Sequence, residues 1–110
     1  MESSSRLQQL LEMYTENSND SFILFALAKE YEQLDQIEHA LKHYEELRQK
    51  DKDYVGLYFH YAHLYVQLED VENALKIYNE GIQTAVSQND LHALSELKNA
   101  KLNFEMEFGL

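Results

Sequence analysis

The sequence contains no cysteine, no proline and only three glycines among its 110 residues. Without cysteine the chain can form no disulfide framework and perform no thiolate chemistry, a composition compatible with a reducing compartment. Without proline nothing interrupts a helix from within, and a chain rich in Leu, Ala, Glu, Gln and Lys favours helices. These absences predict an all-α protein.

Long apolar runs and a basic surface are missing as well. The first six residues are polar, and no stretch approaches the ~18 consecutive apolar residues that a spanning helix needs. Twenty acidic residues against nine lysines and arginines give a formal net charge of −11. Such a surface repels nucleic acid and anionic membranes. We expect a cytoplasmic protein with neither as a partner, whose charge either maintains solubility or steers a basic partner.

The chain repeats itself with a period of 34 residues. Segments 21–54 and 55–88 share 12 identities when one period is laid over the other. Composition alone would give roughly two or three identities. A repeat of this length is typical of helical solenoids, and it points to binding another polypeptide as the class of function.

Each repeat contains two helical patterns, predicted at 21–34 and 37–50 in the first copy and at equivalent places in the second. Apolar residues recur at steps of three and four along each pattern. Short polar breaks at 35–36 and 69–70 leave room only for antiparallel hairpins. Small residues, Ala28 and Ala40 with their equivalents, are expected where the two helix axes approach closely.

These positions resemble the tetratricopeptide repeat, whose pattern runs large apolar, Leu, small and Tyr, followed by Ala and an aromatic residue in the second helix. The places are held by Leu24, Leu27, Ala28, Tyr31, Ala40 and Tyr44, and again by Tyr58, Tyr61, Ala62, Tyr65, Ala74 and Tyr78. The usual proline near the end of the repeat is absent. Gly81 replaces a small or apolar core residue, and we expect it to loosen its helix by ~1 kcal/mol.

The resemblance implies one domain over residues 1–110, a right-handed superhelical stack of antiparallel helix hairpins with about six helices. The expected parts are an N-terminal capping helix 3–16, repeat 1 at 21–54, repeat 2 at 55–88, a C-terminal capping helix 89–106 and a tail 107–110. The last helix carries polar residues where a following helix would pack, at Ser95, Glu96 and Asn99. We expect Leu91, Leu94 and Leu97 to pack on the preceding repeat.

Chemistry-bearing motifs are absent from the sequence. It has no nucleophile–base–acid set, no glycine-rich phosphate loop and no paired-cysteine spacing, so we expect neither an enzyme nor a cofactor. His39 and His43 lie one helical turn apart, a spacing that could ligate one metal ion. We expect instead a solvated pair on the outer face, and no metal.

The resemblance implies that the first helix of each hairpin lines a concave groove that binds a peptide or protein. The groove residues carried over are Phe22, Phe25, Lys29, Glu32, Phe59, His60, His63, Val66, Gln67, Leu97 and Lys101, with Ala93 beside them. Phe25 and Phe59 repeat in phase and would form an apolar anchor. The alternative is that packing at the helix ends covers one or both rings.

The C-terminal end offers a second interpretation. Apolar and acidic residues alternate over 104–110, which is unusual for a free tail. This end could pack back on its own stack, associate with another chain, or fray. The alternative function is therefore a homodimeric structural module that needs no external ligand and associates through Phe104, Met106, Phe108 and Leu110.

Overall fold

The structure, a computed structural model, describes residues 5–110 and contains six α-helices and no strand within them. This confirms the predicted all-α fold. The chain divides into two compact units, Met1–Tyr54 and Val55–Leu110. No helix within the described range is long and apolar enough to cross a membrane. The right-handed stacking of the hairpins stays a prediction.

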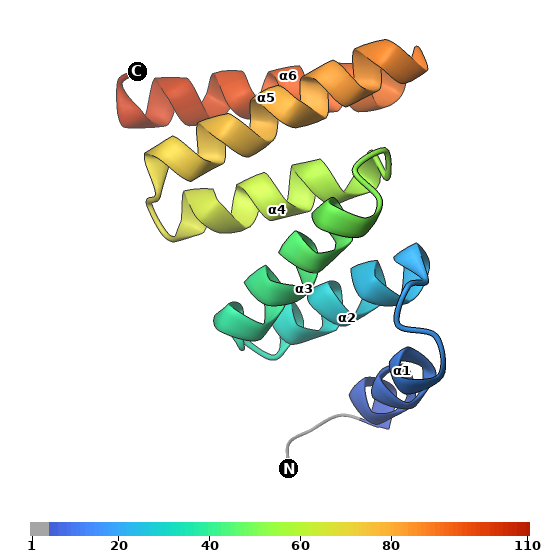
Figure 1. The fold of residues 1–110 in the computed structure, drawn as a ribbon. Coiled ribbons are helices and arrows are strands. Elements are labelled where there is room, and N and C mark those ends of the chain that lie inside the picture. Colours follow the sequence, from blue (N-terminus) through green and yellow to red (C-terminus); the bar gives the residue numbers. More distant parts are fainter. Residues whose placement is uncertain (1–4) are drawn as a thin grey trace. The chain divides into compact units, whose positions relative to one another are not determined.

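The first unit contains α1 (Ser5–Glu16), α2 (Ser21–Gln33) and α3 (Ile37–Lys50). Helices α2 and α3 form an antiparallel hairpin (Figure 1). Asp20 caps α2, because its Oδ1 accepts hydrogen bonds from two backbone amides of the first turn, at 2.9 and 3.2 Å. The chain reverses at Asp35, which adopts the left-handed conformation with φ 59°. The left-handed conformation of this one residue lets the chain reverse between α2 and α3.

The small residues of the repeat lie in the core of the hairpin. Ala28 and Ala40 are completely buried, as are Leu24, Tyr44 and Leu47. Small side chains let two helix axes approach closely, and the large side chains around them fill the remaining space. The repeated alanines thus fix where α2 meets α3.

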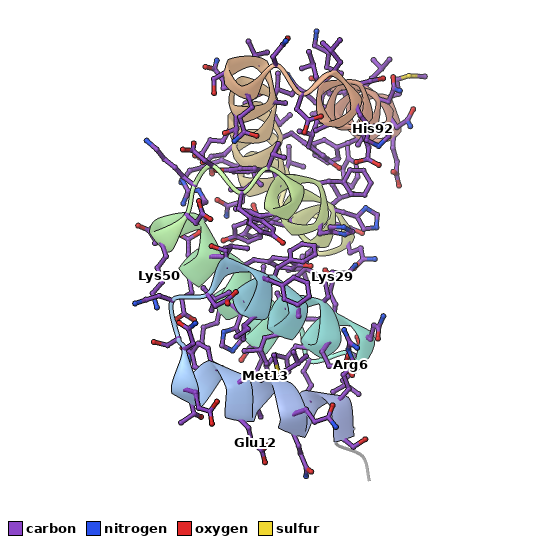
Figure 2. All side chains as sticks on the ribbon, turned by 90° about the vertical axis from the view of Figure 1, so that its right-hand side faces the viewer. Arg6, Glu12, Met13, Lys29, Lys50 and His92 are labelled. Atoms are coloured by element: carbon purple, nitrogen blue, oxygen red, sulfur yellow. The ribbon has the colours of Figure 1, made fainter. Side chains whose placement is uncertain are left out.

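Helix α1 packs on this hairpin through a narrow apolar face. Leu7 and Leu10 are buried, and the Tyr14 hydroxyl donates a hydrogen bond of 2.8 Å to Glu46 Oε2 on α3. Figure 2 shows Met13 on the side of α1 that faces α2, whereas Glu12 points away from it. The first two residues of the predicted helix 3–16 lie outside the described residues.

The second unit contains α4 (Gly56–Gln67), α5 (Val71–Gln88) and α6 (Leu91–Phe108). Helix α5 contacts both α4 and α6, and it runs antiparallel to α6 (Figure 1). Asp90 caps α6 by accepting a hydrogen bond of 3.0 Å from the amide of Ala93. Gly109, with φ 69°, ends α6 in the left-handed conformation that glycine adopts without strain.

Gly81 lies at a close approach inside this unit. A Cβ atom at this position would come within 2.5 Å of Tyr58 Cβ on α4 and 3.2 Å of Leu97 Cδ1 on α6. A carbon–carbon contact of 2.5 Å is too close, so glycine is what lets α4 pack against α5 here. Its low helix propensity is offset by the packing that it permits.

Helix α6 buries only part of the face that the sequence pattern suggested. Leu97 is 1% exposed, but Leu91 is 70% exposed, so the prediction that both pack on the preceding repeat was wrong for Leu91. The buried face is instead defined by Leu97 and Phe104, two turns apart. Leu97 reaches the space beside Gly81, and Phe104 packs on Tyr78, so both contacts of the buried face are made with α5.

The boundaries of the last two helices also depart from strict repetition. Lys50, the end of α3, corresponds to Thr84 by the repeat, but α5 continues to Gln88. Helix α6 then continues to Phe108, beyond the predicted end of the capping helix at residue 106. The first two residues of the expected tail, Glu107 and Phe108, are therefore helical.

Candidate partner-binding surface

The second unit contains an open pocket of about 410 Å³ between α4 and α6. This volume lies within the ~300–1,000 Å³ of typical ligand clefts. We name it the α4–α6 pocket. Helices α4, α5 and α6 all contribute to its lining: Phe59, His63 and Val66 from α4, Tyr78 from α5, and Glu96, Asn99, Ala100, Asn103, Phe104 and Glu107 from α6.

Aromatic rings make up much of the apolar lining of the pocket. Phe104 is 2% exposed, and its ring centroid lies 6.0 Å from that of Tyr78. On α4, Phe59 stacks on His63 with the centroids 6.4 Å apart and the rings nearly parallel. Burial raises the pKa of Tyr78, so its phenol stays neutral at physiological pH. These rings offer uncharged surface to a large apolar side chain.

The α6 side of the pocket is a polar row. Exposed side chains recur there at steps of three and four residues, so they share one side of the helix: Glu96, Asn99, Asn103 and Glu107. Neither glutamate forms an ion pair within residues 5–110, and no Lys or Arg lines the pocket. Most of this row was not predicted from the sequence, because Glu96 and Asn99 were interpreted as solvated cap positions. Their three- and four-residue recurrence with Asn103 and Glu107 was the signal available.

The structure places the α4 residues expected in the groove at or beside this pocket. Phe59, His63 and Val66 line it directly. His60 is half-buried and contacts Phe59 edge-to-face, with the ring centroids 5.3 Å apart. Gln67 is exposed, and its Nε2 lies 3.4 Å from His63 Nε2. One face of α4 thus gathers these side chains.

The α6 residues expected in the groove lie elsewhere. Leu97 was predicted to offer its side chain to a partner, but it is buried in the core beside Gly81. That prediction was wrong because the Leu97 side chain packs toward Gly81 of α5. Lys101 is half-buried, and its Nζ lies 3.9 Å from Glu105 Oε2 on the same helix. Ala93 is half-buried near the start of the helix.

In the first unit, the expected groove residues all lie on α2. Phe22 is 60% exposed, whereas Phe25 packs against Tyr54, with a centroid distance of 5.5 Å. Lys29 Nζ lies 3.7 Å from Glu32 Oε1. Glu32 Oε2 accepts a hydrogen bond of 2.9 Å from the hydroxyl of a buried tyrosine on α3. That these side chains form a groove with those of α4 stays a prediction.

A buried histidine lies on α3. His43 is 5% exposed, so the prediction of a solvated pair was wrong for this member, while His39 is exposed. The His43 ring stacks on Tyr31, and its Nδ1 lies 3.1 Å from Glu46 Oε1. Burial lowers the pKa of His43, although Glu46 opposes the shift, so the ring is neutral at physiological pH. Its surroundings are those of a packed core side chain.

Glu46 joins α1 to α3. Burial alone would raise the pKa of this carboxyl, but hydrogen bonds from Tyr14, Lys50 and His43 hold it below its usual value. The Tyr14 ring also contacts the His43 ring edge-on, with the centroids 5.5 Å apart. This cluster serves the packing of α1.

The residues expected to drive self-association divide into two groups. Phe104 is buried, and Phe108 is half-buried with its ring centroid 4.9 Å from that of Phe104. Phe104 therefore packs on its own unit, which is one of the three alternatives that the sequence left open for this end, and it is not exposed for self-association. Met106 and Leu110 are 71% and 59% exposed.

Comparisons with known proteins agree with this architecture. The family model of the tetratricopeptide repeat matches residues 31–97. The chain belongs to the tetratricopeptide repeat family. Members of this family generally bind other proteins and are typically non-enzymatic scaffolds. No match was found among curated proteins.

Two solved structures of a tetratricopeptide repeat domain protein from Salinibacter ruber are similar to this chain. The crystal structure is 41% identical, covers 78% of this chain and 96% of its own chain, and superposes with a TM-score of 0.74. The solution structure is also 41% identical, covers 78% of this chain and 87% of its own, and has a TM-score of 0.75. The tetratricopeptide fold therefore extends over most of the sequence.

Proposed function

We propose that this tetratricopeptide repeat protein is an adaptor that binds a segment of another polypeptide in the α4–α6 pocket. The observation that carries the proposal is the pocket itself, about 410 Å³ with aromatic rings inside and polar side chains along the α6 rim. Apolar clefts with a few polar groups at the edge are the usual form of a binding site. Phe59, expected from the sequence as an anchor, lies in its wall.

The chemistry of the chain supports a polypeptide as the ligand. With a formal charge of −11 the surface repels polyanions, which argues against nucleic acid and anionic lipid as partners. Side-chain amides at Asn99 and Asn103 can both donate to and accept from a peptide backbone. The lack of cysteine supports a reducing compartment such as the cytoplasm as the place of action.

A peptide-display selection on the purified chain tests this function. The matched variants are Asn103→Trp and Leu102→Trp, adjacent exposed positions near the middle of α6. Asn103 lines the pocket and Leu102 does not, so only the first tryptophan blocks it. Circular dichroism and thermal melting of both variants establish that they fold equally.

We expect the wild-type chain to enrich peptides that bind it in solution, that Asn103→Trp loses and that Leu102→Trp retains. Binding weakened about tenfold by the first variant alone corresponds to loss of one well-buried apolar contact. A selection that yields no such peptide, or peptides insensitive to both variants, contradicts the proposal.

Self-association is the second candidate function, and one observation favours it. The side of α6 opposite its buried face carries Leu91, Leu102 and Met106, which are 70%, 53% and 71% exposed. We name these three residues the outer face of α6. Large exposed apolar side chains along one helix face are typical of an interaction surface.

Light scattering across a range of protein concentrations distinguishes this candidate. Self-association predicts a dimer that Leu102→Glu with Met106→Glu converts to a monomer, while the pocket variant Asn103→Trp leaves it unchanged. A wild-type chain that is monomeric at high micromolar concentration excludes it.

A further inference from the structure

The arrangement of charges around the α4–α6 pocket also indicates what kind of segment fits. We infer that the pocket recognises an extended peptide with a large apolar residue in the centre and Lys or Arg two positions before and two positions after it. This inference rests on the proposed function and adds the chemistry of the ligand.

The polar row of α6 has acidic ends and amide groups in the middle. Glu96 and Glu107 lie at the two ends, and Asn99 and Asn103 lie between them. At 1.5 Å per residue, the row spans roughly 16 Å along the helix. An extended peptide rises about 3.3 Å per residue, so about five peptide residues match this length.

In an extended peptide, successive side chains point to opposite sides, which determines which of them face the pocket. Positions i−2, i and i+2 point to the same side, while i−1 and i+1 point away. When position i enters the pocket, positions i−2 and i+2 lie roughly 7 Å to either side of it, within reach of Glu96 and Glu107 for a long side chain. The amides of Asn99 and Asn103 then lie beside the peptide backbone.

The charge of the surrounding unit favours the same ligand. Residues 55–110 carry three lysines against eight Asp and Glu residues, a formal charge of −5. None of the three lysines lines the pocket. Lys101 follows the lining residue Ala100 in the sequence, but its Nζ lies 3.9 Å from Glu105 Oε2 on the same helix. An acidic peptide would therefore meet like charge at both ends of the pocket without a compensating cation.

The apolar wall explains why the central residue should be large. Phe104 and Tyr78 provide buried rings, and Phe59 with Val66 provides half-buried apolar surface on α4. Leu, Met, Phe or Trp would cover this surface, whereas alanine would leave most of it exposed. We expect alanine at the centre to weaken binding about tenfold or more.

Fluorescence anisotropy with short labelled peptides tests the inference. The probe carries Trp at the centre and Arg at i−2 and i+2 in a Gly/Ser frame with blocked ends. Three controls change one feature each: Ala at the centre, Glu at i−2 and i+2, or the two arginines moved to i−1 and i+1. The last control keeps the composition and net charge of the probe, so it separates recognition from general attraction to an acidic protein.

Matched protein variants complete the test. Glu96→Gln with Glu107→Gln removes the acidic ends of the row, and Glu69→Gln with Glu72→Gln removes two exposed charges of the same unit that do not line the pocket. We expect the first pair to weaken binding of the probe about fivefold and the second pair less than twofold. Binding should also weaken as salt concentration rises.

The inference is overturned when the probe does not bind, when the Glu-flanked or shifted peptides bind as well as the probe, or when both charge pairs have equal effects. These failures differ from a failure of the proposed function. If display selection yields pocket-dependent peptides that lack basic residues at the flanking positions, the function stands and the specificity is wrong. If no pocket-dependent peptide exists, both fail.

Discussion

The two terminal helices cover their neighbouring hairpins with different chemistry. Helix α1 uses two buried leucines and a hydrogen-bonded cluster around Glu46. Helix α6 uses Leu97 and Phe104, packed around a glycine and a tyrosine of α5, and leaves an open pocket against α4. The difference indicates that α1 mainly closes its unit, whereas α6 closes its unit and at the same time forms one wall of the pocket proposed as a binding site.

We expect the largest loss of stability when the buried aromatic ring of α6 is removed. Phe104→Ala removes a ring that is 2% exposed, so we expect the free energy of unfolding to fall by about 3–5 kcal/mol. Urea denaturation measures the change. Phe108→Ala is the control, because this half-buried ring should contribute less. Equal losses for the two variants would show that Phe104 does not anchor α6.

The glycine of α5 provides the next test. Gly81→Ala places a methyl group within 2.5 Å of Tyr58 Cβ, which forces α4 and α5 apart. Overpacking costs about 1–3 kcal/mol, although alanine recovers about 1 kcal/mol in helix propensity. We expect a net loss in urea denaturation, while Gln83→Ala on the exposed side of α5 changes little. A Gly81→Ala chain more stable than wild type would contradict this packing.

The cluster that joins α1 to α3 should make the first unit sensitive to acid. Because burial lowers the pKa of His43, the unfolded chain takes up a proton on this residue as the pH falls through about 6.5 while the folded chain does not. Stability therefore decreases below that pH until the folded pKa is reached. The lowered pKa of Glu46 acts in the same direction below about 4.5, its usual value.

Thermal melting at a series of pH values measures this effect. His43→Gln keeps a side chain that can donate to Glu46 but does not titrate, so its melting temperature should fall less between pH ~7 and ~5. His39→Gln is the control, since His39 is exposed. Identical pH profiles for wild type and His43→Gln would show that His43 is not the source of the pH-dependent loss of stability.

The smallest effect concerns one difference between the two repeats. Asp70 caps α5 through a hydrogen bond of 3.2 Å to the amide of Asn73, but Gln36, its equivalent, makes no side-chain cap for α3. Gln36→Asp should therefore stabilise the chain by about 0.5–1 kcal/mol, and Asp70→Gln should destabilise it by a similar amount. A Gln36→Asp chain no more stable than wild type, with a folded α3, would show that the backbone at this turn does not permit the cap.

These contrasts also explain which features were predictable from the sequence. The 34-residue period predicted helices at 21–34 and 37–50, because two copies with the same apolar spacing constrain each other. Helix α6 has no second copy. The side of α6 that is buried depends on the space beside Gly81 and on the contact of Phe104 with Tyr78, which are properties of the packed unit. Leu97 was expected both to pack on the preceding repeat and to line the groove, and spacing alone could neither decide between these two expectations nor predict the exposure of Leu91.

The candidate site, too, could be predicted from the sequence only in part. Phe59, His63 and Val66 were expected on the binding side because their position in the repeat implied it, and they do line the pocket. The α6 wall was not foreseen, since Leu97 and Lys101 were chosen from the repeat position. In contrast to α4, the side of α6 that meets the pocket depends on how Phe104 packs on Tyr78.

One measurement tests the central claim most directly, namely that the wall formed by α4 and α6 is where a partner binds. A peptide obtained by display selection is titrated into isotopically labelled protein, and the backbone amide shifts are followed by NMR. The account predicts that the largest shifts come from the residues of α4 and α6 around Phe59, His63, Asn99 and Asn103. Largest shifts on α1, on α2 around Phe22 and Lys29, or on the outer face of α6 would contradict it.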